Sequence, residues 1–254
     1  MNKGNSTTQE LLKVGREHLR GGAYDAAIDA FMQAIGLESG YAEAYYYRGN
    51  SYYAQEKYAE ALADYDKAIK LNKDYAKAYY YRGSTYYRMD DFDRAVEDFT
   101  QAIRILQKKN TDDDKEVLAW AYGNRGNAYY EKHDYVEAIA DYTQAIGLKP
   151  RAADMYYNRG NAYAERGSYD KAIGEFTKAL SLKDDFAYAY NNRGVAHAKQ
   201  NNYDQAIDDF EQAIKHSPDH NKARHNKSLA RHEKEDNRES VTLKPDNANH
   251  AYAF

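Results

Sequence analysis

The sequence predicts an all-α fold, an α-solenoid in which six helix pairs stack and a C-terminal capping helix closes the stack. The first observation is a unit of about 34 residues that occurs six times along the chain. The second is that apolar and small residues return at helical spacing within each unit. The third is physical, because one helix hairpin cannot bury both of its apolar faces and must stack on its neighbours.

The copy that begins at Ala119 shows how the unit is built. Gly126 and Ala138 place almost no side chain where two antiparallel helices are expected to cross, which leaves room for rings such as Tyr142. Pro150 then marks the end of the second helix. The size of the side chain at Gly126 and at Ala138 is therefore expected to be constrained.

The predicted solenoid covers residues 8–236, between a flexible N-terminus at 1–7 and a polar C-terminal tail at 237–254. The predicted repeats are 8–41, 42–75, 76–109, 119–152, 153–186 and 187–220. Residues 221–236 are the predicted capping helix, because Arg224, Ser228 and Arg231 replace the Tyr, Gly and Tyr of the earlier repeats.

A nine-residue insertion, 110–118, separates the third and fourth repeats. Asn110 to Asp114 combine turn and N-cap residues, which predicts longer helices on either side of an acidic corner. A cation site is the alternative, but three consecutive Asp lack the alternate spacing of a calcium loop. A solvated loop or a contact surface is the preferred interpretation.

Composition limits the class of protein. The chain has 28 Tyr against 7 Phe, which predicts half-buried aromatic positions whose hydroxyls reach water or a partner. The formal net charge is −4, so we expect no nucleic-acid partner and no membrane partner. No apolar run approaches the roughly 20 residues that span a bilayer, and no signal-peptide core is evident, which favours a cytoplasmic protein. The absence of Cys excludes a disulfide framework.

Five repeats carry an Arg and, sixteen residues later, an acidic residue. The pairs are Arg48 and Asp64, Arg82 and Asp98, Arg125 and Asp141, Arg159 and Glu175, and Arg193 and Asp209. In the first repeat both members change together, to Val14 and Ala30, which predicts that each Arg contacts its acid. A row of Arg side chains for phosphate or RNA is the alternative.

The repeats resemble the tetratricopeptide repeat (TPR) family, in the multi-repeat form of bacteria and archaea, over residues 8 to about 235. The second repeat carries the resemblance with Tyr45, Gly49, Tyr52, Ala61 and Tyr65 in register. The resemblance implies a right-handed superhelix whose first helices line a concave groove, which usually binds an extended or helical segment of another protein. It implies no reaction, cofactor or metal.

The resemblance extends to the asparagine ladder of the O-linked N-acetylglucosamine transferase, in which Asn side chains hold a peptide backbone. The polar candidates for such a groove are Asn50, Ser84, Asn124, Asn127, Asn158, Asn161 and Asn192, and the tyrosine walls are Tyr46, Tyr53, Tyr80, Tyr87, Tyr130 and Tyr157. Each amide offers a donor and an acceptor to a peptide main chain. The alternative is that the Asn side chains bridge neighbouring helices and the Tyr side chains only pack.

The predicted function is a non-enzymatic interaction scaffold that binds a protein or peptide segment in this Tyr/Asn-lined groove. An RNA-binding or homo-oligomeric assembly module is the alternative, with tyrosines stacking on bases or with the tail associating between molecules. Ala251 to Phe254 are apolar and aromatic, so the tail either docks on a complementary surface or stays solvated. An enzyme is not expected, because no nucleophile, base and orienting residue recur at fixed spacing.

Overall fold

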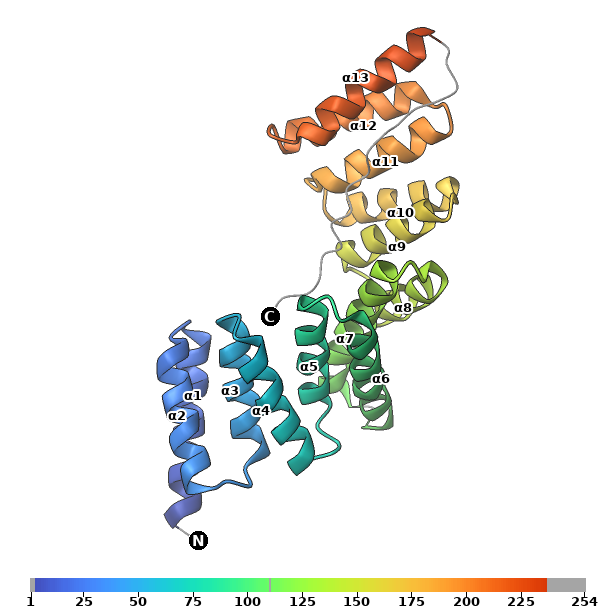
Figure 1. Ribbon diagram of the computed structural model, residues 1–254. Coiled ribbons are helices and arrows are strands. Elements are labelled where there is room, and N and C mark those ends of the chain that lie inside the picture. The colour runs from blue at the N-terminus through green and yellow to red at the C-terminus, as the bar shows by residue number, and fades with distance from the viewer. Residues whose placement is uncertain (1–2, 110, 237–254) are drawn as a thin grey trace. The chain divides into compact units, whose positions relative to one another are not determined.

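The computed structural model describes residues 3–109 and 111–236, which form thirteen helices and no strand (Figure 1). In chain order the helices are α1 (Lys3–Arg20), α2 (Tyr24–Leu37), α3 (Ala42–Ala54), α4 (Tyr58–Leu71), α5 (Ala76–Arg88), α6 (Phe92–Lys109), α7 (Asp112–Glu131), α8 (Tyr135–Leu148), α9 (Ala153–Glu165), α10 (Tyr169–Leu182), α11 (Ala187–Lys199), α12 (Tyr203–His216) and α13 (Asn221–Asp236). The predicted all-α helical repeat fold is confirmed. The right-handed superhelix stays a prediction.

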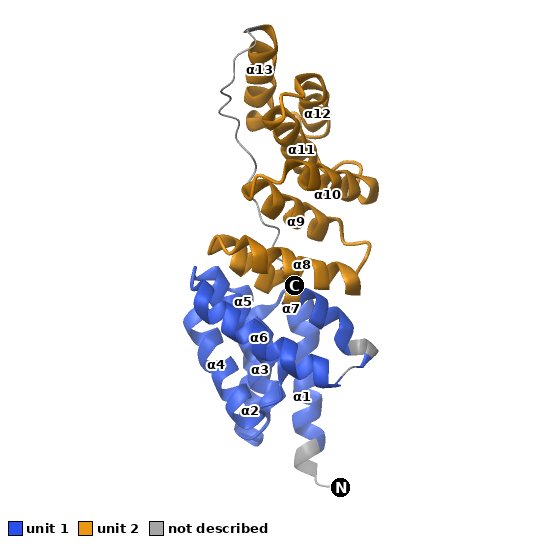
Figure 2. Cartoon of the chain, turned by 90° about the vertical axis from the view of Figure 1, so that its right-hand side faces the viewer, with its two compact units in different colours: residues 1–121 blue, residues 122–254 orange. Residues whose placement is uncertain are grey.

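The chain divides into two compact units, unit 1 with residues 1–121 and unit 2 with residues 122–254 (Figure 2). In unit 1 each helix packs on the next from α1 to α6, and in unit 2 the same holds from α8 to α13. First helices also contact the first helix of the next repeat, α1 with α3, α3 with α5, α9 with α11 and α11 with α13. The second helices of the described residues show no such contact, so the first helices form the inner layer of each unit.

Helix bounds differ from the expectation at the N-terminus and at the insertion. The helix α1 begins at Lys3, so most of the segment 1–7 that is predicted to be flexible is helical. The helices α6 and α7 have 18 and 20 residues, and α7 begins at Asp112, inside the segment 110–118. The insertion therefore lengthens both helices, as expected, and most of it is helix instead of loop. The tail 237–254 and its predicted docking lie outside the described residues.

A residue with positive φ ends the first helix of each pair. The φ angles are 59° at Glu56, 58° at Asp90, 63° at His133 and 62° at Asn201, and Gly22 and Gly167 supply the same conformation at 75° and 69°. In the second repeat Glu56 N donates to Tyr53 O and Lys57 N donates to Tyr52 O, both at 2.9 Å. These bonds satisfy the last carbonyls of the helix and reverse the chain within a few residues.

In every repeat an aromatic ring of the second helix lies on a glycine of the first. The pairs are Gly15 and Phe31, Gly49 and Tyr65, Gly83 and Phe99, Gly126 and Tyr142, Gly160 and Phe176, and Gly194 and Phe210. A Cβ atom on Gly126 would lie 2.8 Å from Tyr142 Cε1, which is closer than two carbon atoms approach in folded proteins. All six rings are fully buried, so the glycine sets the distance between the two helices.

The five Arg and acid pairs are all formed. Arg125 Nε and Nη2 donate to Asp141 Oδ2 and Oδ1 at 2.7 and 2.8 Å, and the other pairs are bonded at 2.7 to 2.9 Å. Burial raises the pKa of the Asp141 carboxyl, and the Arg125 guanidinium opposes this rise. The predicted contact is confirmed, and the geometry gives no support to a row of Arg side chains for phosphate or RNA.

The ring contact predicts opposite effects for two glycines of the fifth repeat. Gly160→Ala should lower the free energy of unfolding by about 1–3 kcal/mol, because the added methyl group must displace Phe176. Gly174→Ala is the matched control, since nothing lies within 4 Å of its Cβ position, and it should raise that free energy by about 0.5–1 kcal/mol. Urea unfolding measures both, and a change of the same sign would contradict the proposed constraint.

The buried pair predicts a large coupling energy. Asp141→Leu alone should lower the free energy of unfolding by about 3–5 kcal/mol, because the half-buried Arg125 loses the charge that compensates it. Arg125→Leu with Asp141→Leu should cost less than Asp141→Leu alone. A double-mutant cycle measures the coupling, and the exposed pair Arg231 and Glu211 is the control, with at most about 1 kcal/mol. Equal coupling in the two cycles would contradict this account.

Candidate functional site

The first helices of the two units carry different side chains at one repeat position, the residue before the Arg of the ion pair. This residue is Tyr47 in α3 and Tyr81 in α5, and Asn124 in α7, Asn158 in α9 and Asn192 in α11. The Tyr81 ring stacks on Tyr65 with centroids 6.4 Å apart, so it joins the aromatic core of unit 1. The same position therefore packs as an aromatic side chain in unit 1 and as an amide in unit 2.

Four of the predicted tyrosine walls lie in the core, Tyr46, Tyr80, Tyr130 and Tyr157. Tyr46, Tyr80 and Tyr157 are 4%, 1% and 0% exposed. Tyr80 lies 5.7 Å from the Phe99 ring and Tyr157 lies 5.9 Å from the Phe176 ring, so each packs on the same ring that rests on the glycine. We therefore correct their assignment, because the position faces the second helix and fills the space inside the hairpin. Burial raises the pKa of the Tyr46 phenol well above its usual value, so it stays neutral.

The other predicted residues of unit 1 keep part of their surface exposed. Tyr53 packs edge-on or tilted against Tyr58, and Tyr87 against Phe92, with centroids 5.8 and 5.5 Å apart. Asn50 Oδ1 accepts a hydrogen bond of 2.8 Å from Tyr65 Oη, and Ser84 Oγ donates to Tyr80 O at 3.0 Å. Asn50 and Ser84 are thus engaged within their own repeat.

In unit 2 the predicted asparagines bond from one repeat to the next. Asn158 Nδ2 donates to Asn127 Oδ1 at 3.0 Å, and Asn192 Nδ2 donates to Asn161 Oδ1 at 2.8 Å. Both bonds join residues 31 apart, so they are the same contact one repeat later. Asn127 Nδ2 also points to Asn124 Oδ1, at 3.5 Å. These distances match the alternative in which the Asn side chains bridge neighbouring helices.

Two further asparagines extend this set. Asn226 Nδ2 donates to Asn191 Oδ1 and Asn191 Nδ2 donates to Asn192 Oδ1, both at 3.0 Å. The sequence analysis missed Asn226 because it treats the capping helix as a closing element, although Asn226 follows Asn192 by 34 residues and repeats its register. We call the whole set the amide row, with Asn124, Asn127, Asn158, Asn161, Asn191, Asn192 and Asn226. All seven are less than 5% exposed.

Two atoms of the amide row have no hydrogen-bond partner, Asn158 Oδ1 and Asn161 Nδ2. The orientation of each amide is fixed by the other end of the group, because Asn158 Nδ2 and Asn161 Oδ1 are already bonded. One acceptor and one donor therefore remain, a single helical turn apart on α9.

Tyr130, the remaining predicted tyrosine of unit 2, is 7% exposed and packs on Tyr135 with ring centroids 5.3 Å apart.

The described residues present no group of three His, Cys, Asp or Glu side chains that is placed to hold a metal ion. Among the helices that the structure describes, none combines the length and the apolar character needed to cross a bilayer. The chemistry of the amide row is that of neutral hydrogen-bond donors and acceptors.

Four family models match the chain. Models described as tetratricopeptide repeat match residues 74–151, 124–190 and 187–220, and one described as TPR repeat matches residues 49–90, so together they cover 49–220. The chain belongs to the tetratricopeptide repeat family. TPR proteins mediate protein–protein interactions. A comparison with curated protein sequences finds no match.

Solved TPR structures are similar over most of the chain. YrrB, described as a TPR protein with an unusual peptide-binding site, is 26% identical with a TM-score of 0.66, over 80% of this chain and 100% of its own. A MamA structure is 27% identical with a TM-score of 0.61, over 71% of this chain and 93% of its own. PilF of Pseudomonas aeruginosa has a TM-score of 0.74 at 12% identity, over 91% of this chain and 100% of its own, which shows the fold alone.

The amide row predicts a local loss of stability when one amide is removed. Asn192→Ala deletes the donor to Asn161 Oδ1 and to Tyr157 Oη, so it should cost about 1–3 kcal/mol. Because a TPR stack is held by nearest-neighbour contacts, hydrogen exchange should rise in α9 and α11 and stay unchanged in α3. Gln144→Ala, an exposed amide on α8, is the control. A rise of equal size in α3 would contradict this local coupling.

Proposed function

We propose that this TPR protein is a non-enzymatic cytoplasmic scaffold that binds an extended segment of another protein through the segment's main chain. The binding site is the amide row of unit 2, and nucleic acid is not a partner. The observation that carries the proposal is the buried acceptor Asn158 Oδ1 beside the buried donor Asn161 Nδ2. A peptide main chain offers N–H and C=O groups in alternation, which is the complement of this pair.

The two unpaired amide atoms are more stable when a main-chain ligand bonds to them than when they stay buried without a partner. A buried polar atom without a partner costs about 1–3 kcal/mol, so a segment that displaces the covering side chains and bonds to both atoms gains affinity whatever its own side chains are. The bonds to Asn127 and Asn192 hold the two amides in place before binding, which lowers the entropy cost of association. Tyr188 on α11, 43% exposed, adds aromatic surface in the same layer of first helices.

YrrB supports the proposal by similarity. It is described as having an unusual peptide-binding site, and its whole length is covered by this chain. This likeness supports a peptide ligand, and the two unpaired amide atoms on α9 support the amide row as its site.

Binding can be tested with a ten-residue peptide selected from a random library against the whole protein. Isothermal titration calorimetry should show that Asn161→Ala raises the Kd of that peptide by about tenfold or more, since a buried hydrogen bond is lost. Gln144→Ala should leave the Kd unchanged. Selection of no peptide by the wild-type protein would contradict the proposal.

A second measurement changes the ligand instead of the protein, which removes any effect of folding. Each peptide N–H is methylated in turn, so that one main-chain donor at a time is lost. Methylation at the residue that faces Asn158 should weaken binding by about tenfold or more, and most other positions should tolerate it. If alanine substitution of the peptide side chains abolishes binding while methylation has no effect, recognition is by side chains and the proposal is wrong.

A further inference from the structure

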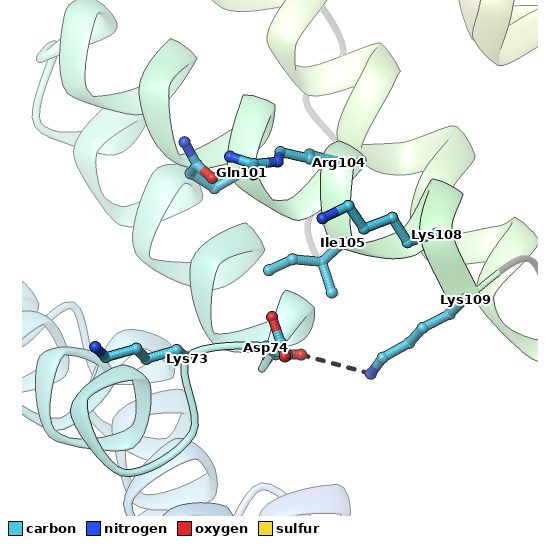
Figure 3. Close-up of a pocket in the computed structure, with 7 residues that line it drawn as sticks. All are labelled: Lys73, Asp74, Gln101, Arg104, Ile105, Lys108 and Lys109. Atoms are coloured by element: carbon cyan, nitrogen blue, oxygen red, sulfur yellow. Dashed lines mark hydrogen bonds between the residues drawn. The ribbon is translucent and has the colours of Figure 1, made fainter.

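A basic pocket lies in unit 1, apart from the amide row. It has a volume of about 500 Å³ and is lined by Lys73, Asp74, Gln101, Arg104, Lys108 and Lys109 around Ile105 (Figure 3). The residues come from the turn between α4 and α5 and from the C-terminal half of α6. All of them belong to unit 1, so the pocket does not depend on the other unit.

The pocket exists because α6 is longer than the other second helices. The helices α2, α4, α8, α10 and α12 have 14 residues each, whereas α6 has 18. The added turn, residues 106–109, carries Lys108 and Lys109 beside the turn that holds Lys73 and Asp74. The insertion that follows the third repeat has therefore produced a feature that the repeat pattern itself does not contain.

One face of α6 forms a wall of the pocket. Gln101, Arg104, Ile105 and Lys108 follow the spacing of three and four residues that places side chains on one side of a helix. Ile105 is half-buried, while Arg104 and Lys108 are exposed. Lys109 Nζ donates to the main-chain oxygen of Asp74 at 3.5 Å, which joins the two walls. The half-buried Ile105 side chain is thus surrounded by cationic groups.

The cations of the pocket are not compensated. Lys73, Arg104 and Lys108 form no ion pair with any carboxylate of the described residues. Four cations and one carboxylate leave a local charge of 4 − 1 = +3 in a chain whose net charge is −4. The dipole of α6 favours cations in its last turn, but Arg104 lies before that turn and Lys73 belongs to another element. Helix-end stabilisation therefore does not account for the cluster.

We propose that this pocket binds an acidic segment of a partner protein, with Asp or Glu side chains among its cations. The planar guanidinium of Arg104 suits two oxygens of one carboxylate, and Lys73 and Lys108 supply point charges to others. Ile105 gives the methylene groups of a Glu side chain an apolar contact. A nucleic acid would need a long track of Lys and Arg side chains, whereas these cations are confined to one pocket. The proposal does not rest on the main-chain site of unit 2.

Fluorescence anisotropy of labelled hexaglutamate with the full-length protein at low ionic strength tests the pocket. The wild-type protein should bind hexaglutamate and not hexaglutamine. Arg104→Gln with Lys108→Gln should raise the Kd by roughly tenfold, the effect of two partly exposed charge pairs. The matched control is Lys178→Gln with Lys215→Gln, which removes the same charge from exposed positions of α10 and α12. It should leave the Kd within about twofold.

Several outcomes would overturn the proposal. These are equal weakening by both double variants, no preference for hexaglutamate over hexaglutamine, or tighter binding of a single-stranded DNA oligomer that the pocket variant abolishes. Thermal unfolding checks that each double variant is folded. Salt offers a test without any substitution, because the wild-type protein should lose hexaglutamate binding at high ionic strength. Asn161→Ala should not affect hexaglutamate, so a failure of this proposal and a failure of main-chain binding are distinguishable.

Discussion

The structure depends on the close approach of two helices within each pair, which the ring and glycine contact makes possible. A buried ring from the second helix rests where the first helix has no Cβ atom, as with Tyr142 on Gly126. Because the ring and the glycine recur every period, each pair has the same internal geometry and can stack on the next. The rest of the molecule, including the layer of first helices, follows from that repeated distance.

Charge adds a second constraint inside each pair. Arg125 and Asp141 bond through two parallel contacts at 2.7 and 2.8 Å, in a position where neither charge is well hydrated. Such pairs contribute little net stability compared with apolar residues, but loss of one member is costly. The arrangement therefore favours one register of the two helices, because any slip would separate Arg125 from its acid.

The same repeat position carries different side chains in the two units. In unit 1 the residue before the Arg is a tyrosine that packs into an aromatic core, and in unit 2 it is an asparagine that bonds to the preceding repeat. The amide row leaves one acceptor and one donor without partners, Asn158 Oδ1 and Asn161 Nδ2. Unit 1 instead carries a cationic pocket at the lengthened α6. The two units of one repeat fold thus differ in their polar chemistry, with buried amides in unit 2 and a cationic pocket in unit 1.

The sequence by itself determined the helix pairs and their internal contacts, because these depend on residues a fixed distance apart. Periodicity predicts Gly126 beside Tyr142, and the joint change to Val14 and Ala30 predicts that Arg125 meets Asp141. Only the tertiary structure decided which neighbours the candidate groove residues of the first helices contact. Spacing places Tyr80 and Asn158 on first helices, but it does not reveal which neighbour each contacts, so Tyr80 lies in the core and Asn158 bonds to Asn127. The basic pocket also required the structure, because it joins residues from two repeats that only the added turn of α6 brings together.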